Sequence, residues 1–234
     1  MTDNKTFQPK PWFSVLLVLT GILIGLLLAL LAVWADYEST AYGFLKRANK
    51  PFRGLSCPVF VGRDESATVS IKVSNITDQT ISPSVRSELS TPLTTDRKLE
   101  YIKLQPGEQK VLQRTVGPEN IDLGQFIFAY AYVYSAYPMP DEQSTCGIFV
   151  LPVSGGGSII LMLGTTLSIL LMAAGLFFLQ KNEMIARRSR SLLFMAVVTV
   201  LAMLLGFIGW WIQAIILLVI LILMLVISLS ILVR

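Results

Sequence analysis

SLLFMAVVTVLAMLLGFIGWWIQAIILLVILILMLVISLSILV, residues 191–233, runs for 43 residues without an Asp, Glu, Lys or Arg. A helix needs ~20 apolar residues to cross the hydrocarbon core of a bilayer, so this stretch suits two crossings, at 191–207 and 212–233. Gly209 and Trp210 between them are typical of a tight turn at a membrane interface. The stretch predicts an integral membrane protein.

Two further apolar segments predict transmembrane helices at 12–34 and 159–180. The first could instead be a signal peptide, because residues 33–35 place small side chains where a cleavage site needs them. Its length and the tryptophans at its two ends, Trp12 and Trp34, favour a retained helix. The chain is therefore expected to have four spans, with cleavage of the first left open.

Charge sets the expected topology. The tail 1–11 and the short loop 181–190 are basic, and basic segments stay cytoplasmic. Both termini are therefore expected in the cytoplasm and residues 36–157 outside it, in a multi-pass protein of the cell membrane. The polar region 36–152 holds 12 basic and 13 acidic residues. This near-neutral charge argues against nucleic-acid binding, which needs basic residues to neutralise the phosphates. The expected partners are the lipid bilayer and other membrane proteins.

In the polar region, apolar and polar residues alternate, so the hydrophobic pattern repeats every two residues. Residues 36–54 form an expected juxtamembrane connector, either a short amphipathic helix or a plain link. Within 55–152, Thr68–Ser74 alternates strictly, and other short alternating segments follow between Pro- and Gly-containing turns. This pattern predicts an all-β Ig-like sandwich. Residues 153–158, VSGGGS, predict a flexible hinge before the second span.

Three motifs give the sandwich a resemblance to a known type of module. They are the 67–75 strand ending in Asn-Ile-Thr-Asp, Leu-Gln-Pro-Gly-Glu at 104–108, and Asp-Leu-Gly-Gln-Phe at 122–126. The sandwich resembles the CARDB and NEW3 type of Ig-like module, which implies a spacer or binding surface without catalytic residues. The third motif is similar to a tyrosine corner, but Phe126 lacks the hydroxyl. The four-span chain as a whole matches no named family.

Cys57 and Cys146 are the two cysteines of the chain, and both fall in the external domain. A disulfide is the favoured interpretation outside the cytoplasm, with free buried thiols or a redox pair as alternatives. The chain has no histidine, which excludes Ser-His-Asp and Cys-His hydrolases and the common zinc sites. The acidic pairs at 64–65 and 141–142 are typical of solvated turns. No catalytic, cofactor or metal site is therefore predicted, and the protein is expected not to be an enzyme.

Gly21 and Gly25 form a G-x-x-x-G pattern in the first span. Small residues at this spacing let another helix approach closely, so they are candidate helix-packing residues, although chance occurrence is an alternative. The sequence Asn75-Ile76-Thr77 also fits a glycosylation sequon, which matters only in a glycosylating host.

The strand 125–136 alternates between large rings and small side chains. Its aromatic residues are expected mainly to fill the sandwich core, with the small residues facing a neighbour. Alternatively, the last rings emerge as a contact surface, because aromatic residues and Met are enriched in interfaces. The candidate contact residues are Tyr134, Tyr137 and Met139.

The predicted spans contain no ionisable residue, which argues against a transporter or channel working alone. The expected function is a non-enzymatic accessory or structural subunit of a membrane complex, with the external domain making protein–protein contacts. One alternative is a surface receptor or adhesion module that binds an extracellular protein or polymer through residues 137–142. A second alternative is an accessory subunit of a transporter.

Overall fold

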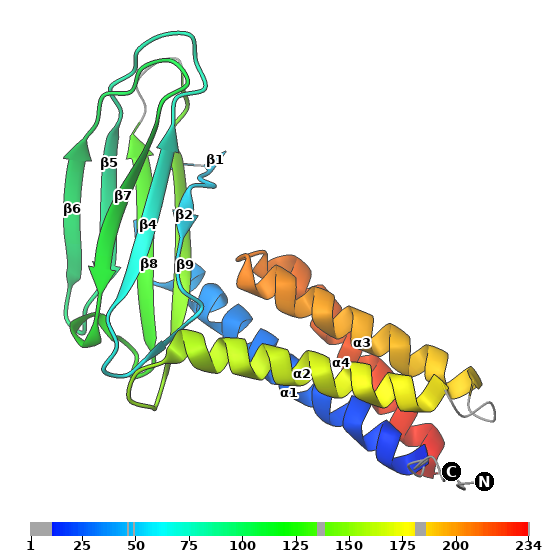
Figure 1. The fold of residues 1–234 in the computed structure, drawn as a ribbon. Helices are drawn as coiled ribbons and strands as arrows, with labels where there is room; N and C mark the ends of the chain where they lie inside the picture. Colours follow the sequence, from blue (N-terminus) through cyan, green and yellow to red (C-terminus); the bar gives the residue numbers. More distant parts are fainter. Residues whose placement is uncertain (1–10, 46, 49, 135–138, 181–185, 234) are drawn as a thin grey trace, which may run out of the picture. The chain divides into compact units, whose positions relative to one another are not determined.

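The computed structural model describes residues 11–45, 47–48, 50–134, 139–180 and 186–233. These residues form two compact units. The helical unit comprises the chain up to Val33 and from Leu161 onward, and the β-unit comprises Trp34–Ile160. Figure 1 shows the four helices and the two layers of strands.

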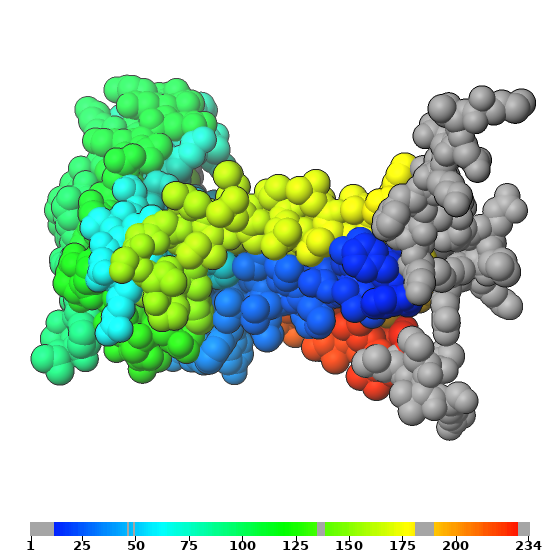
Figure 2. Space-filling model, turned by 60° about the horizontal axis from the view of Figure 1, so that its bottom comes forward, coloured from blue at the N-terminus to red at the C-terminus, as the bar shows by residue number. Residues whose placement is uncertain are grey.

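Among the described residues, four helices are long and apolar enough to cross a membrane. They are α1 (Pro11–Ala41), α2 (Gly157–Gln180), α3 (Ala186–Phe207) and α4 (Trp211–Val233). Within the helical unit, α1 (blue) lies against α2 (yellow) in Figure 2.

Three helices extend beyond the expected spans. Helix α1 continues past the expected span 12–34 into the expected connector, because no Pro or Gly stands between Trp34 and Gly43 and Trp34 Nε1 donates to Glu38 Oε1 at 3.0 Å. Helix α2 begins at Gly157, inside the expected hinge, and α3 begins within the expected loop 181–190.

The β-unit contains two sheets. The six-stranded sheet has the order β1-β9-β8-β5-β6, with β3 also paired to β9, and the three-stranded sheet has the order β2-β4-β7. The strands are β1 (Lys50–Pro51), β2 (Leu55–Ser56), β3 (Phe60–Gly62), β4 (Ala67–Ser74), β5 (Ser84–Ser90), β6 (Thr95–Tyr101), β7 (Gln109–Val116), β8 (Phe126–Tyr134) and β9 (Glu142–Leu151). A short 3-10 helix, Pro118–Asn120, follows β7.

Both sheets contribute to the same clusters of buried apolar side chains. One cluster joins Ile71 of β4 to Val133 of β8, and another joins Val69 of β4 to Ile127 of β8. The residues of β8 that face these clusters are Ile127, Ala129, Ala131 and Val133. The expectation that the aromatic residues of β8 fill the core between the sheets is therefore wrong: its small and β-branched residues do.

The segment predicted as a flexible hinge is packed against the β-unit. Gly155 and Gly156 have φ angles of 65° and 75°, which L-residues with side chains rarely adopt. A Cβ on Gly157 would lie 2.5 Å from Val61 Cα, so the glycine permits close approach. Glu65 Oε2 accepts hydrogen bonds from the N–H groups of Gly62 at 2.8 Å and Gly157 at 2.7 Å, which places a carboxylate at the first turn of α2.

Candidate functional site

The aromatic residues of β8 lie on the face of the six-stranded sheet that points away from the three-stranded sheet. We call Phe126, Phe128, Tyr130, Tyr132 and Tyr134 the aromatic face, and residues 34–45 the cover segment. Three rings of the cover segment pack on this face: Trp34 lies 5.3 Å from Phe126, Tyr42 4.5 Å from Phe128 and Phe44 5.3 Å from Tyr130, between ring centroids. The cover segment thus forms a third layer over the sheet.

Hydrogen bonds fix the cover segment to β9, the neighbour of β8. The buried carboxylate of Asp36 accepts a hydrogen bond from the backbone N–H of Gly147 at 3.0 Å. Three residues later, Ser39 Oγ donates to Thr145 Oγ1 at 3.3 Å. A Cβ on Gly147 would lie 1.9 Å from Ala35 O, so only glycine allows this approach.

The tyrosine hydroxyls at this face are hydrogen-bonded, and that of Tyr42 joins the cover segment to the rest of the β-unit. Tyr42 donates to Asp122 Oδ2 at 2.6 Å, and Tyr130 donates to Gln143 Oε1 at 2.8 Å. Tyr132 donates to Asp141 Oδ2 at 2.7 Å. Burial, helped by the neighbouring carboxylate, raises the pKa of Tyr132 to about 12 and also raises the pKa of Tyr42. These phenols therefore stay protonated donors at physiological pH.

Tyr42 also contacts the segment that resembles a tyrosine corner. The corner contains Asp122, whose backbone exchanges hydrogen bonds of 2.7 and 3.1 Å with Phe126. A tyrosine from a distant part of the chain, 80 residues earlier, reaches the carboxylate of this corner. The sequence could not show this contact, because its two residues are far apart along the chain.

Two of the three predicted contact residues, Tyr134 and Met139, lie among the described residues. Tyr134 has 58% of its surface exposed, at the uncovered end of the aromatic face. Met139 is half-buried and packs against the core cluster of Val133 and Ile81. Tyr137 lies outside the described residues. The structure therefore separates Tyr134 from Met139, whose side chain faces a pocket between the two sheets.

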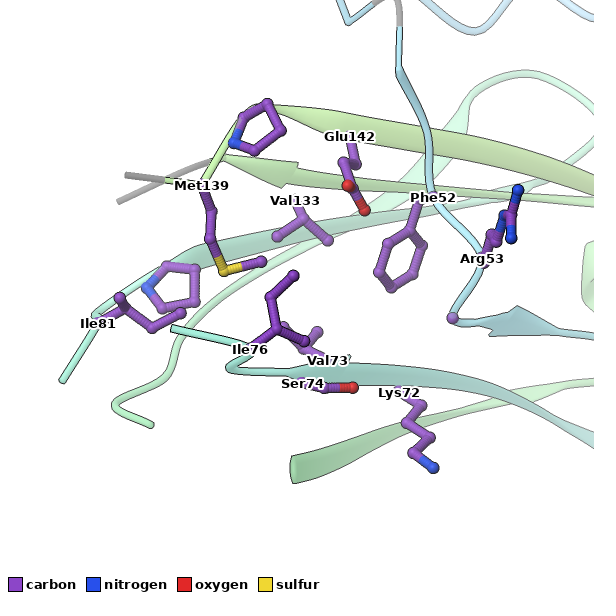
Figure 3. Close-up of a pocket in the computed structure, with 13 residues that line it drawn as sticks. Phe52, Arg53, Lys72, Val73, Ser74, Ile76, Ile81, Val133, Met139 and Glu142 are labelled. Atoms are coloured by element: carbon purple, nitrogen blue, oxygen red, sulfur yellow. The ribbon is translucent and has the colours of Figure 1, made fainter. Parts of the chain in front are cut away.

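This pocket has a volume of about 320 Å³ and opens at one end of the β-unit. Phe52, Val133 and Met139 point into it, and Ile76 stands at its rim with 85% of its surface exposed (Figure 3). The size falls within the range of ligand pockets, and a mainly apolar lining with a few polar groups is typical of binding sites.

Charged side chains border the same pocket. Glu142 Oε1 lies 2.8 Å from Lys50 Nζ, so its charge is balanced. Arg53 and Lys72 also line the pocket, and neither forms an ion pair with another residue that the structure describes. Lys72 alternates along β4 with the core-facing Ile71 and Val73, and its side chain, like that of Arg53, points away from the pocket (Figure 3).

Asn75 connects two of the motifs that carry the family resemblance. Its Nδ2 donates to the carbonyl oxygens of Gln79, Leu104 and Gln105 at 2.7, 3.1 and 3.0 Å. Its Oδ1 accepts from the N–H of Thr77 at 3.0 Å. The amide is buried and fully used in holding two turns together, so this sequon is not accessible for glycosylation in the folded protein.

Cys57 and Cys146 are joined in a disulfide, with their Cα atoms 6.4 Å apart. Both side chains pack against the core cluster that contains Ile127 and Ile148. The bond ties the segment after β2 to β9, at 89 residues of sequence separation. In the chain-entropy treatment, a loop of this length stabilises the folded state by roughly 4–5 kcal/mol.

The glycines of the first span pack within the chain. A Cβ on Gly21 would lie 2.8 Å from Ser168 O of α2, and a Cβ on Gly25 would lie 2.6 Å from Thr199 Cγ2 of α3. Ser168 Oγ donates to the carbonyl oxygen of Gly21 at 2.7 Å. The close approach that G-x-x-x-G permits is therefore used by this chain's own helices.

No family model matches the chain, and no curated protein matches it. Among solved structures, the β-unit resembles the CARDB domain of the PF1109 protein from Pyrococcus furiosus, solved in complex with di-metal ions. That match has 21% identity and a TM-score of 0.35, and it covers 42% of this chain and 89% of that chain. This domain is of the module type that the sequence motifs resemble.

Similar regions also occur in larger enzymes. A β-glucosidase from Listeria innocua matches with 17% identity and a TM-score of 0.31, covering 43% of this chain and 16% of the enzyme. The β-glucuronidase of Bacteroides uniformis matches with 15% identity and a TM-score of 0.33, covering 41% and 13%. The chain thus spans only a small part of these enzymes. In the described part of the chain, no three His, Cys, Asp or Glu side chains gather where they could hold a metal ion.

Proposed function

We propose that the four helices span a membrane, with both termini in the cytoplasm, and that the β-unit is an Ig-like sandwich outside the cytoplasm. The observation that carries this proposal is the apolar surface of the helical unit. The exposed large side chains of α2 and α4 in that unit include Met162, Leu163, Leu167, Leu170, Phe177, Ile212, Ile216, Val219, Leu223 and Val226. Surfaces of this kind are stable against lipid or other apolar helices.

Within that membrane, the protein acts as a non-enzymatic accessory subunit of a larger complex, and its external domain makes protein–protein contacts. Two features support this role. Ser168 Oγ at the α1–α2 contact is hydrogen-bonded to Gly21 O inside the unit, and the exposed side chains of α2 and α4 leave apolar faces for partner helices. The β-unit keeps an open, charged-rimmed pocket although the cover segment occupies most of its aromatic face.

Co-purification tests this function. The tagged protein is extracted from native membranes in mild detergent, and the proteins that accompany it are identified by mass spectrometry. An unrelated four-span protein with the same tag is the control for carry-over. Stoichiometric membrane partners are expected, and an ATPase or permease among them would specify a transport complex. A protein that purifies alone would contradict the subunit role and favour a receptor or adhesion module.

Protease accessibility tests the topology. Protease added to intact cells, or to spheroplasts if a cell wall is present, should cut within residues 36–157 and leave a C-terminal tag protected. Loss of the tag without lysis would place the C-terminus outside and contradict the proposed orientation.

A further inference from the structure

We infer that the uncovered end of the aromatic face binds a proline-rich segment of a partner protein in the polyproline II conformation. Two exposed tyrosines, Tyr101 and Tyr134, each contact one of two prolines that are three residues apart in that segment. The inference rests on the proposed function, since it specifies the kind of partner segment that the external domain contacts.

Three neighbouring strands place the two tyrosines in one row. Ser84, the first residue of β5, pairs with Tyr101 at the end of β6 and with Tyr134 at the end of β8. Residues that pair directly across neighbouring strands lie on the same face of a sheet. Val85, the next residue of β5, belongs to the core cluster, so the row faces away from the three-stranded sheet.

The row has exposed rings and an open centre. Tyr101 has 79% of its surface exposed and Tyr134 has 58%, and the small side chain of Ser84 lies between them. Neighbouring strands lie ~4.8 Å apart, so two strand spacings place the tyrosines about 10 Å apart.

This separation matches the period of a polyproline II helix. Such a helix has about three residues per turn and rises ~3.1 Å per residue, so residues i and i+3 lie on the same side, about 9 Å apart. A segment that crosses β8, β5 and β6 in this conformation therefore brings one proline to each tyrosine. Aromatic-lined surfaces bind P-x-x-P segments in this way, because the ligand backbone is already ordered before it binds.

The polar groups and charges of the row complement the same ligand. The carbonyl groups of polyproline II make no internal hydrogen bonds, so they are free to accept from the tyrosine and serine hydroxyls of the row. The row itself carries no charge, and Arg86 in the next row is paired with Glu88, which suits an uncharged segment.

The covered end of the aromatic face shows how it holds a segment of chain. The ring of Tyr130 stacks on Phe44 of the cover segment, with 5.3 Å between ring centroids. Its hydroxyl oxygen lies 3.2 Å from the carbonyl oxygen of Leu45, within hydrogen-bond distance. The uncovered row offers the same combination of ring and hydroxyl two strand positions further along the face.

The size of the uncovered end favours a short segment over a folded partner or a second copy of the chain. A stable protein–protein interface uses about 20–30 residues on each side. The exposed apolar side chains here are those of Tyr101, Tyr134 and Leu99. A proline-rich segment suits so small a surface, since it loses little conformational entropy on binding.

Fluorine NMR of the full-length protein in detergent, labelled with ring-fluorinated tyrosine, tests this surface. The signals of Tyr101 and Tyr134 are assigned by their loss in Tyr101→Phe and Tyr134→Phe. The probes are the peptide Ac-Ala-Pro-Ala-Ala-Pro-Ala-NH2 and its isomer Ac-Ala-Pro-Ala-Pro-Ala-Ala-NH2, in which the prolines no longer lie on the same side. We expect saturable shifts of both signals by the first peptide and about tenfold weaker binding of the isomer.

Removal of either ring provides the decisive comparison. Both rings are exposed, so Tyr101→Ala and Tyr134→Ala should fold normally, and each should weaken binding of the first peptide about tenfold, as measured at the remaining tyrosine. The control is Leu93→Ala, which removes an exposed apolar side chain between β5 and β6 and should leave binding unchanged.

Several results would overturn the inference. They are unmoved tyrosine signals, equal binding of the two isomers, and unchanged binding in both alanine variants. Shifts caused by cellohexaose but not by the first peptide would also overturn it, in favour of a carbohydrate ligand.

Co-purification separates this inference from the proposed function. Partners that accompany the wild type and the double variant Tyr101→Ala with Tyr134→Ala equally would remove this surface as the docking site and leave the subunit role standing. A wild-type protein that purifies alone but binds the first peptide would remove the subunit role and leave the site.

Discussion

Gly147→Ala tests whether the cover segment is held on the sheet. The added Cβ would lie 1.9 Å from Ala35 O and 2.2 Å from Ala35 C. These are backbone atoms, so no side-chain rotation can relieve the overlap, and Ala35 and Asp36 must move away from β9. The hydrogen bond from Gly147 to Asp36 and the packing of Trp34 on Phe126 would then be lost or weakened.

The magnitude follows from these two contacts. A hydrogen bond to a charged group contributes about 1.5–3 kcal/mol, and an aromatic pair contributes about 0.5–1.5 kcal/mol. Together they indicate that the free energy of undocking the cover segment falls by about 2–4 kcal/mol. Since ~1.4 kcal/mol is a factor of ten, amide hydrogen exchange in residues 34–45 should accelerate by at least ~30-fold.

Hydrogen–deuterium exchange with mass spectrometry measures this change on the full protein in detergent. Gly43→Ala is the matched control, because the same substitution in the same segment meets no atom within 4 Å. Its exchange should be unchanged or slower, since replacing Gly by Ala at an unstrained position stabilises by about 0.4–1 kcal/mol. Unchanged protection in Gly147→Ala would show that β9 does not hold the cover segment, and the aromatic face would then be a free surface.

Three further perturbations test other parts of the structure. Asn75→Ala should lower the free energy of unfolding of the β-unit by about 2–4 kcal/mol, because buried carbonyl groups lose their donor. Thermal unfolding measures the change, with Ile76→Ala as the control. Equal unfolding midpoints for the two variants would contradict the structural role of the Asn75 amide. Gly21→Leu with Gly25→Leu should broaden the size-exclusion peak of the protein purified alone, since both glycines contact helices of the same chain; an unaltered peak and melting curve would refute intrachain packing. The pKa of Tyr132, raised to about 12, means that the folded state holds this proton more tightly than the unfolded state. Stability from this group should be complete below pH ~10 and decline as the pH rises through about 12, and Tyr132→Phe should remove that decline in urea titrations; a decline of equal size in the variant would assign it to other groups.

The membrane-length helices were predictable because long uncharged runs have few alternatives, but their ends were not. Helix α1 outlasts its apolar segment since Asp36 and Ser39 find hydrogen-bond partners on β9. Those partners lie more than 100 residues later in the sequence. A prediction from neighbouring residues cannot take these partners into account. It therefore places the end of the helix where the hydropathy falls.

The orientation of β8 illustrates a second limit. Its period of two predicted a strand with a ring-bearing face and a small face, and the larger rings were expected in the core. That expectation assumed two layers, whereas the cover segment makes a third. The signal was present in Trp34, Tyr42 and Phe44, three aromatic residues in or beside an expected connector, where exposed rings would be unfavourable.

Strand β6 carried no such signal. Its sequence, TDRKLEY, has charged residues on both faces, a pattern that is not typical of a half-buried strand. It is a strand because it pairs antiparallel with β5 along its whole length. Arg114 of β7 adds a contact, since its guanidinium donates to Ser87 Oγ at 2.9 Å and pairs with Asp96 of β6. Charges at this open edge protect it from pairing with another chain, so the strand is stabilised by its neighbours rather than by its own pattern.

The features that most resembled binding determinants in the sequence are used inside the folded chain. Most rings of β8 lie under the cover segment, Asn75 holds two turns, and Gly21 and Gly25 contact α2 and α3. Substitutions at these positions would reduce partner binding by disturbing the fold, and they could not separate a structural role from a contact role. Arg53 and Lys72 differ, because they are exposed and form no ion pair with the described residues. Reversing their charge would change the surface while leaving the core intact, so such a variant would not share that ambiguity.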